Sequence, residues 1–168
     1  MRQQSSVGNI FRTVLLAGLI GLALVARPSH AAAEGAEAIP AHYQTSYTLE
    51  GQGSFDKAIN EVLQVLRIAP DDYLANLRTG WLYYLAGRYD DAVVHYRKAI
   101  QLSPRSLEAK LGILLPLMAN LRWKEAEATA REVMRSDPGN FLARSRLAFT
   151  LFSLGRFKDA EQLYAGLL

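Results

Sequence analysis

Cysteine is absent from all 168 residues of the chain. Disulfides, thiolate metal sites, a cysteine nucleophile and a lipid-modified N-terminal cysteine are therefore excluded. There are only three histidines, and no two of them have the i, i+4 spacing of a metal-binding helix. Glycine-rich phosphate loops and the Gly-x-Ser-x-Gly elbow are also missing, and no serine stands in an ordered relation to a histidine and an acid. We therefore expect no enzyme, no metal and no cofactor.

Net charge is also missing from most of the chain. Of the 19 Lys and Arg residues, three (Arg2, Arg12 and Arg27) precede residue 34, and no acid does. From Glu34 onward the remaining 16 basic residues balance all 16 acidic ones. The sequence pI of about 9.3 therefore owes much to the first segment. The rest of the chain has no general electrostatic reason to bind nucleic acid or an anionic membrane.

The longest apolar run lies near the start of the chain. Residues 13–26 carry no charge, a positively charged segment precedes them, and an Arg-Pro pair and a run of alanines follow. This order is typical of a secretory signal peptide cleaved after Ala31 or Ala33. The alternative is an uncleaved membrane anchor. A membrane-spanning helix needs about 20 apolar residues, however, and the run over 13–26 is shorter. We expect a signal peptide over 1–33, a flexible lead-in over 34–41 and no membrane span after cleavage.

Internal repetition is the feature that this sequence has in abundance. Prolines, alanines, aromatic residues and glycines each recur at intervals of 34 residues. The prolines are Pro70, Pro104 and Pro138; the alanines are Ala58, Ala92, Ala126 and Ala160; the aromatic residues are Phe55, Tyr89, Trp123 and Phe157. The glycines are Gly53, Gly87 and Gly155, with Leu121 as the exception in that series. Because the series keep fixed offsets, one unit is repeated along the chain.

This register resembles that of the tetratricopeptide repeat (TPR). The copy over 73–106 matches at Gly80, Tyr83, Gly87, Tyr89, Ala92, Tyr96, Ala99 and Pro104, and departs at Asn76 and Thr79, where tryptophan and leucine are typical. The resemblance covers 39–168 and implies an all-α fold, a right-handed TPR solenoid of about four helix-turn-helix repeats. The repeats are expected over 39–72, 73–106, 107–140 and 141–168, the last one incomplete. The family is defined by architecture, so the resemblance says little about function.

Each repeated residue has a physical role in such a unit. Gly87, between the two helices, can adopt a left-handed backbone conformation without strain. The small Ala92 lets the second helix approach the first, and Pro104 cannot continue that helix and ends it. Pro116 falls inside the first helix of the third copy. We expect a local bend at Gly112–Pro116, with the clash of the proline ring relieved by the missing side chain of Gly112.

The expected ligand surface follows from position in the repeat. In this family the ligand usually contacts first-helix residues that line the concave groove. Carried over by position, these are Tyr43, Tyr47, Leu77, Trp81, Tyr84, Leu115, Met118, Phe149 and Phe152, with Arg78 and Arg146 at the margins. Members that clamp a C-terminal carboxylate have lysine and asparagine at such positions, so we do not expect that ligand. An apolar, aromatic groove suits an amphipathic helix or an extended segment as ligand. The alternative for the leucines is that they pack in the core between neighbouring helices.

We therefore expect a protein–protein interaction scaffold in the cell envelope, with a peptide or protein segment as its partner. One alternative is an N-terminal or assembly component of a larger envelope or polysaccharide-export complex. Another is a homo-oligomer formed through an open C-terminal edge, because the sequence stops at Leu168, before the last copy is complete. The signal favours the periplasm, with secretion or anchoring by an uncleaved signal as alternatives.

Overall fold

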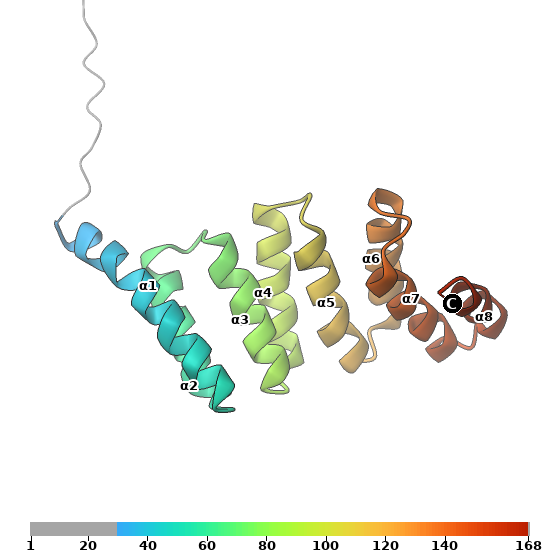
Figure 1. The fold of residues 1–168 in the computed structure, drawn as a ribbon, viewed down its shortest axis with the longest axis horizontal. Helices are drawn as coiled ribbons and strands as arrows, with labels where there is room; N and C mark the ends of the chain where they lie inside the picture. Colours follow the sequence, from blue (N-terminus) through green and yellow to red (C-terminus); the bar gives the residue numbers. More distant parts are fainter. Residues whose placement is uncertain (1–29, 168) are drawn as a thin grey trace, which may run out of the picture.

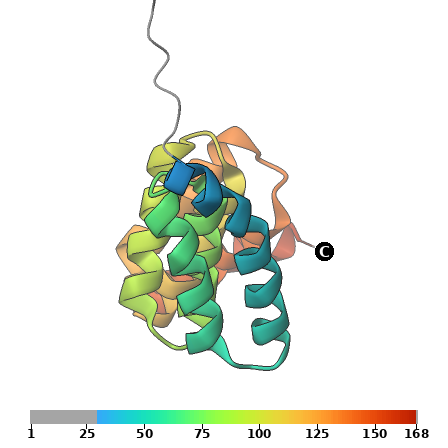
Figure 2. The same cartoon turned by 90° about the vertical axis from the view of Figure 1, so that its left-hand side faces the viewer.

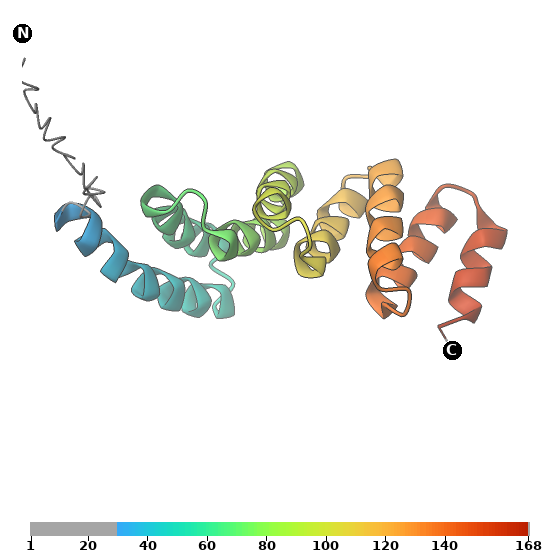
Figure 3. The same ribbon diagram turned by 90° about the horizontal axis from the view of Figure 1, so that it is seen from above.

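The computed structural model describes residues 30–167, which form eight helices and no strand (Figure 1). The helices are α1 (His30–Gly51), α2 (Phe55–Ile68), α3 (Tyr73–Leu85), α4 (Tyr89–Leu102), α5 (Leu107–Ala119), α6 (Trp123–Ser136), α7 (Phe141–Ser153) and α8 (Phe157–Ala165). Each packs on the next along the chain, and α3 also contacts α5, as α5 contacts α7. Seen from above, the pairs follow one another in a single row (Figure 3). The expected all-α helical repeat fold is confirmed.

The turns inside the helix pairs depend on one left-handed residue each. That residue is glycine in three turns, with φ of 70° at Gly53, 75° at Gly87 and 76° at Gly155. Leu121 occupies the same place in the third turn and adopts φ of 56°. The backbone N–H of the following residue, Arg122, donates to Leu117 O at 2.8 Å, as the residues after the glycines donate to theirs. The turn geometry predicted for Gly87 is thus kept in the third repeat despite a branched side chain.

The turns between helix pairs are closed by a different device. Asp72, Ser106 and Asn140 each stand immediately before a first helix and lie 34 residues apart. Their side chains accept the backbone N–H three residues on, at 2.7, 3.2 and 2.9 Å. A helix N-terminus leaves such donors without intrahelical partners, so these caps fix where α3, α5 and α7 begin.

The core is held close by small residues on the second helices. Ala58, Ala92, Ala126 and Ala160 are at most 2 % exposed, as the close approach predicted for Ala92 requires. The buried apolar side chains form two clusters, one from α2 to α4 and the other from α3 to α8. Figure 2, the view from the N-terminal end, shows the later helices stacked behind α1 and α2. Neighbouring pairs therefore bury the faces that a single pair would leave open.

Gly112 has a packing role that the sequence did not indicate. Helix α5 continues through Pro116, and the bend at Gly112–Pro116 with relief of the proline clash stays a prediction. The space beside Gly112 is filled by the ring of Tyr96 on α4, and a Cβ at Gly112 would collide with the ring atom Cε1. On its other side the same ring abuts Gly80, where a Cβ would lie 2.8 Å from Cδ2. Both glycines make room for an aromatic ring.

The N-terminal end differs from the flexible lead-in predicted over 34–41. Those residues belong to α1, which begins at His30 and continues through Pro40. The stretch is rich in alanine, the best helix former, and Gly35 lies against Ile68 at the end of α2. The predicted signal peptide lies almost wholly outside the described residues. Within 30–167, no helix is long and apolar enough to span a membrane.

Candidate partner-binding groove

One row of side chains marks the first helices. Tyr47, Trp81, Leu115 and Phe149 lie 34 residues apart on α1, α3, α5 and α7. Since the repeats share one geometry, we call the side of the molecule that carries this row the first-helix face. None of the four side chains is fully buried, so the row remains accessible to a partner.

A cavity of about 240 Å³ opens on this face between α1, α3 and α5. Its lining consists of Tyr47, Leu74, Leu77, Arg78, Trp81, Tyr96, Glu108 and Gly112. Three of the predicted groove residues, Tyr47, Leu77 and Trp81, meet here. Leu77 is only 8 % exposed and belongs to the core, so its packing role is observed and its ligand role stays a prediction.

Arg78 was predicted at the margin of the groove, but it lies in the wall of the cavity. It is 6 % exposed and reaches across to α1, where its Nε donates to Ser46 Oγ at 3.0 Å. Its Nη1 lies 2.9 Å from Glu50 Oε2, and its guanidinium carbon lies 3.5 Å from the ring centroid of Tyr47. Its Nη2 is buried and finds no hydrogen-bond partner in 30–167. A planar guanidinium suits such a buried, stacked ion pair.

The same carboxylate holds the central aromatic residue of the row. Trp81 Nε1 donates to Glu50 Oε1 at 2.6 Å, so both oxygens of Glu50 are used. Tyr84 packs beside Trp81, with ring centroids 5.8 Å apart. The wall is therefore fixed by hydrogen bonds and ring contacts between α1 and α3, which pre-organises it.

Tyr96 forms the floor of the cavity. Its ring is 3 % exposed and lies between Gly80 and Gly112. Burial is the main cause that raises its pKa above the usual value for tyrosine; the charge of Arg146 opposes this effect, and the charge of Glu108 adds to it. The hydroxyl therefore stays neutral over the physiological pH range and is available as a hydrogen-bond donor.

Arg146, also predicted at the groove margin, joins two first helices. Its Nη1 donates to the backbone oxygen of Leu111 at 2.6 Å, which links α7 to α5. Burial lowers the pKa of its guanidinium, as is usual for a cation removed from water.

The remaining predicted residues do not meet at the cavity. The Tyr43 hydroxyl donates to Asp72 Oδ1 at 3.0 Å, the oxygen that also caps α3, and its pKa is raised mainly by burial. Leu115 and Met118 are half-buried, and Met118 packs against the core. These contacts assign structural roles, and a ligand role for these residues stays a prediction.

Phe149 and Phe152 form a separate group further along the molecule. They are 45 % and 55 % exposed. The ring of Phe149 meets Trp123 at a centroid distance of 6.0 Å, and that of Phe152 meets Phe157 at 5.2 Å. We call these four residues the aromatic cluster. It lies on α6, α7 and α8, away from the cavity lining.

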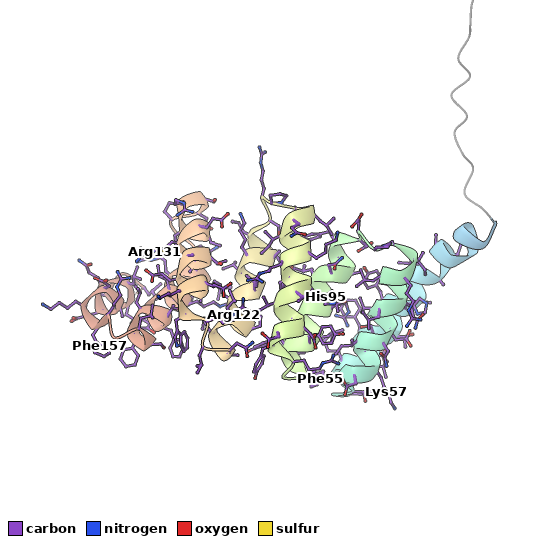
Figure 4. All side chains as sticks on the ribbon, turned by 180° about the vertical axis from the view of Figure 1, so that it is seen from behind. Phe55, Lys57, His95, Arg122, Arg131 and Phe157 are labelled. Carbon is purple, nitrogen blue, oxygen red and sulfur yellow. The ribbon has the colours of Figure 1, made fainter. Side chains whose placement is uncertain are left out.

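The structure suggests no other chemistry in the part that it describes. Residues 30–167 contain no group of three or more His, Asp or Glu placed to hold a metal ion. His95, shown on α4 in Figure 4, stacks on Tyr83 at 5.4 Å, and its Nδ1 lies 3.3 Å from Asn76 Oδ1. Burial lowers the pKa of this histidine, which suits a neutral packing residue.

Sequence reasoning missed Glu50, Ser46, Tyr96 and Glu108 as parts of the site. One signal was available: Arg78 is the only charged residue of α3, whose sequence is YLANLRTGWLYYL. A charge on such a helix needs a partner when it is buried, and that argument would have predicted an acidic partner for Arg78 without saying which helix supplies it.

Comparison with known proteins places this geometry in a family. Models of the tetratricopeptide repeat match residues 43–106 and 117–168. The TPR repeat-containing thioredoxin TTL4 of Arabidopsis thaliana is 32 % identical over 85 residues, which are 51 % of this chain and 12 % of that protein. The chain thus spans about an eighth of the length of this relative.

Solved structures show the same fold. MamA from Desulfovibrio magneticus RS-1 superimposes with a TM-score of 0.72 at 17 % identity, over 77 % of this chain and 73 % of that one. The first TPR domain of Spaghetti (RPAP3), bound to the HSP90 peptide SRMEEVD, gives 0.66 at 18 % identity, over 71 % and 94 %. Together with the two matched segments, which span most of the described helices, these likenesses show that the chain belongs to the tetratricopeptide repeat family.

Proposed function

We propose that this protein is a non-catalytic scaffold that binds a segment of a partner protein along the first-helix face. The observation that carries the proposal is the cavity between α1, α3 and α5, with Tyr47 and Trp81 in its wall. Tryptophan and tyrosine are the residue types that most often dominate binding energy. Here Trp81 is already oriented by Glu50, so little side-chain entropy is lost on binding.

The related fold supports this assignment. In the RPAP3 structure a TPR domain of similar shape holds a short peptide. Solenoids of this kind present extended surfaces to their partners, and stacked repeats need no catalytic group for that task. The exposed rings of Phe149 and Phe152 lie on α7, further along the row of first helices, and would contact a longer segment as well.

A differential pull-down from a cell-envelope extract tests the proposal. The parent protein is compared with Tyr47→Ser, which removes an aromatic wall from the cavity, and with Val94→Ser. Val94 is 62 % exposed on α4 and belongs to a different surface hollow. We expect a partner that the parent and Val94→Ser capture and that Tyr47→Ser loses. Equal capture by all three proteins would mean that the first-helix face is not the binding surface.

We further propose that the protein acts in the periplasm after removal of residues 1–31 or 1–33. The support is the order of charge, apolar run and alanines at the N-terminus. Intact mass spectrometry of the protein recovered from fractionated cells gives the test. A mature mass matching either cleavage, in the periplasmic fraction, is expected; the full-length mass in the membrane fraction would indicate an uncleaved anchor.

Self-association is a second candidate, favoured by the aromatic cluster. Exposed apolar surface on α7 and α8 is typical of an interface. Sedimentation at several concentrations distinguishes the two candidates, since only a self-associating scaffold changes mass. Phe152→Ser would then keep the protein monomeric, whereas Tyr47→Ser would not.

A further inference from the structure

The charges around the cavity do not cancel. Arg78 is the cation of the lining, and the carboxylate of Glu50 lies 2.9 Å from its Nη1. The other oxygen of Glu50 accepts from Trp81. The positive charge is therefore matched by a negative one within the protein, and neither group is left to attract a ligand ion.

Glu108 is the remaining charge in the lining. It is exposed, and among residues 30–167 it makes neither an ion pair nor a side-chain hydrogen bond. Other acids of the helix surface, such as Glu125 and Glu127, are paired with arginines. The charge of Glu108 reaches the cavity floor, where it raises the pKa of Tyr96, while Arg146 of α7, outside the lining, lowers that pKa more strongly. Among the side chains of the lining, the uncompensated charge is thus negative.

The rest of the wall suits a long aliphatic stem that ends in a cation. Leu74 and Leu77 offer apolar contacts, and Trp81 and Tyr47 offer aromatic rings. Lysine and arginine bury their methylene groups on such surfaces and keep the charged end at a polar group. The faces of tryptophan and tyrosine attract cations in addition.

The size of the cavity points to one side chain and not to a whole small molecule. Its volume of about 240 Å³ lies below the roughly 300–1,000 Å³ of typical sites for drug-sized ligands. A peptide lying along the first-helix face would place one residue in it.

We propose that this cavity binds a lysine or arginine side chain of the partner segment, with its cationic end at Glu108. The inference rests on the proposed function and adds a requirement for the ligand. It also separates this chain from the RPAP3 domain, whose peptide SRMEEVD ends in acidic residues. An acidic tail would meet an uncompensated carboxylate here, and like charges repel.

Glu108 also has an ordinary structural role that a test must separate. It lies in the first turn of α5, where a negative charge interacts favourably with the helix dipole. Ser106 already caps that helix, so Glu108→Gln keeps the helix start and removes only the charge. Glu161 on α8 is exposed, has no ion pair in the described part of the chain and lies outside the cavity, and Glu161→Gln is the matched control.

The experiment is a selection of phage-displayed random peptides on the purified protein. We expect peptides that share one lysine or arginine, and a selected peptide made with norleucine at that place should bind more weakly. On Glu108→Gln the Kd of the basic peptide should rise about tenfold, whereas its Kd for the norleucine peptide should change little. On Glu161→Gln both should match the parent.

The outcomes separate the two proposals. Peptides without a common basic residue, or a basic preference that survives Glu108→Gln, would overturn the cation pocket and leave the groove in place. No peptide selected by the parent would overturn the binding groove and the pocket together. Circular dichroism of each variant checks that helicity is retained, and Glu108→Lys adds a positive test, since it should select acidic residues at the same place.

Discussion

The first-helix face has two halves that occupy equivalent positions in the repeat and differ in chemistry. On α1 and α3, Tyr47 lies against the Arg78 guanidinium and Trp81 is hydrogen-bonded to Glu50. On α7, Phe149 occupies the position equivalent to Tyr47 and Trp81, but it has no polar side-chain atom, and its ring packs against that of Trp123 at a centroid distance of 6.0 Å. The repeat therefore determines where an aromatic residue stands, while its neighbours decide whether polar groups or another aromatic ring hold it.

The packing beneath these residues differs in the same way. In the N-terminal half, Tyr96 is large and its neighbour Gly112 has no side chain. One repeat later the equivalent positions are Ala130, which is fully buried, and Arg146, which crosses to Leu111. The large side chain of this pair thus lies on the second helix in one repeat (Tyr96) and on the first helix in the next (Arg146). The Tyr96 arrangement has a cavity beside the ring, and the exchange of bulk between the two helices shapes the floor of that cavity.

Removing Arg78 should separate the two halves most strongly. Arg78→Met leaves the half-buried Glu50 carboxylate and the Ser46 hydroxyl without their partner, and it should reduce the free energy of unfolding by about 3 kcal/mol. Arg146→Met removes one hydrogen bond to a backbone oxygen and should cost about 1 kcal/mol. Urea denaturation followed by circular dichroism measures both. Equal losses would contradict the contrast between a buried ion-pair network and a single bond.

Filling the space at Gly112 should have the next largest effect. Gly112→Ala places a Cβ against the Tyr96 ring and should destabilise the protein by about 2 kcal/mol, since overpacking typically costs about 1–3 kcal/mol. Gly139→Ala is the control, because its Cβ would meet only Asp137 Oδ1, at 3.8 Å. In the background Tyr96→Leu the loss at Gly112 should shrink. If it persisted there, backbone conformation and not the ring would be the cause.

Sequence reasoning predicted the fold well because the repeat is a local and periodic property. The spacing of Pro104, Ala92 and Gly87 reports on helix ends, close approach and turns, which are decided by neighbouring residues. The site was predicted less well because it depends on pairs from different helices. Arg78 was placed at the margin, since nothing along α3 shows that Ser46 and Glu50 lie opposite. Gly112 was explained by Pro116 on the same helix, and its packing against Tyr96, which comes from α4, was not predicted.

The smallest expected effect concerns the turns, where the third repeat departs from the others. Leu121 adopts φ of 56°, a conformation that costs a residue with a Cβ roughly 1–2 kcal/mol. Glycine removes this strain but gains about 0.5–1 kcal/mol of freedom in the unfolded chain. Because Leu121 is 69 % exposed, little burial is lost, and Leu121→Gly should stabilise the protein by about 0.5 kcal/mol.

Leu154 provides the matched control for this substitution. It directly precedes Gly155 and has φ of −84°, so Leu154→Gly relieves no strain and should destabilise by about 0.5–1 kcal/mol. Thermal unfolding of both variants beside the parent measures the two shifts. Opposite signs would show that the third turn is strained by its leucine and that the three glycine turns are not. Destabilisation by both would mean that the Leu121 side chain contributes more through its contacts near Trp123 than its backbone loses.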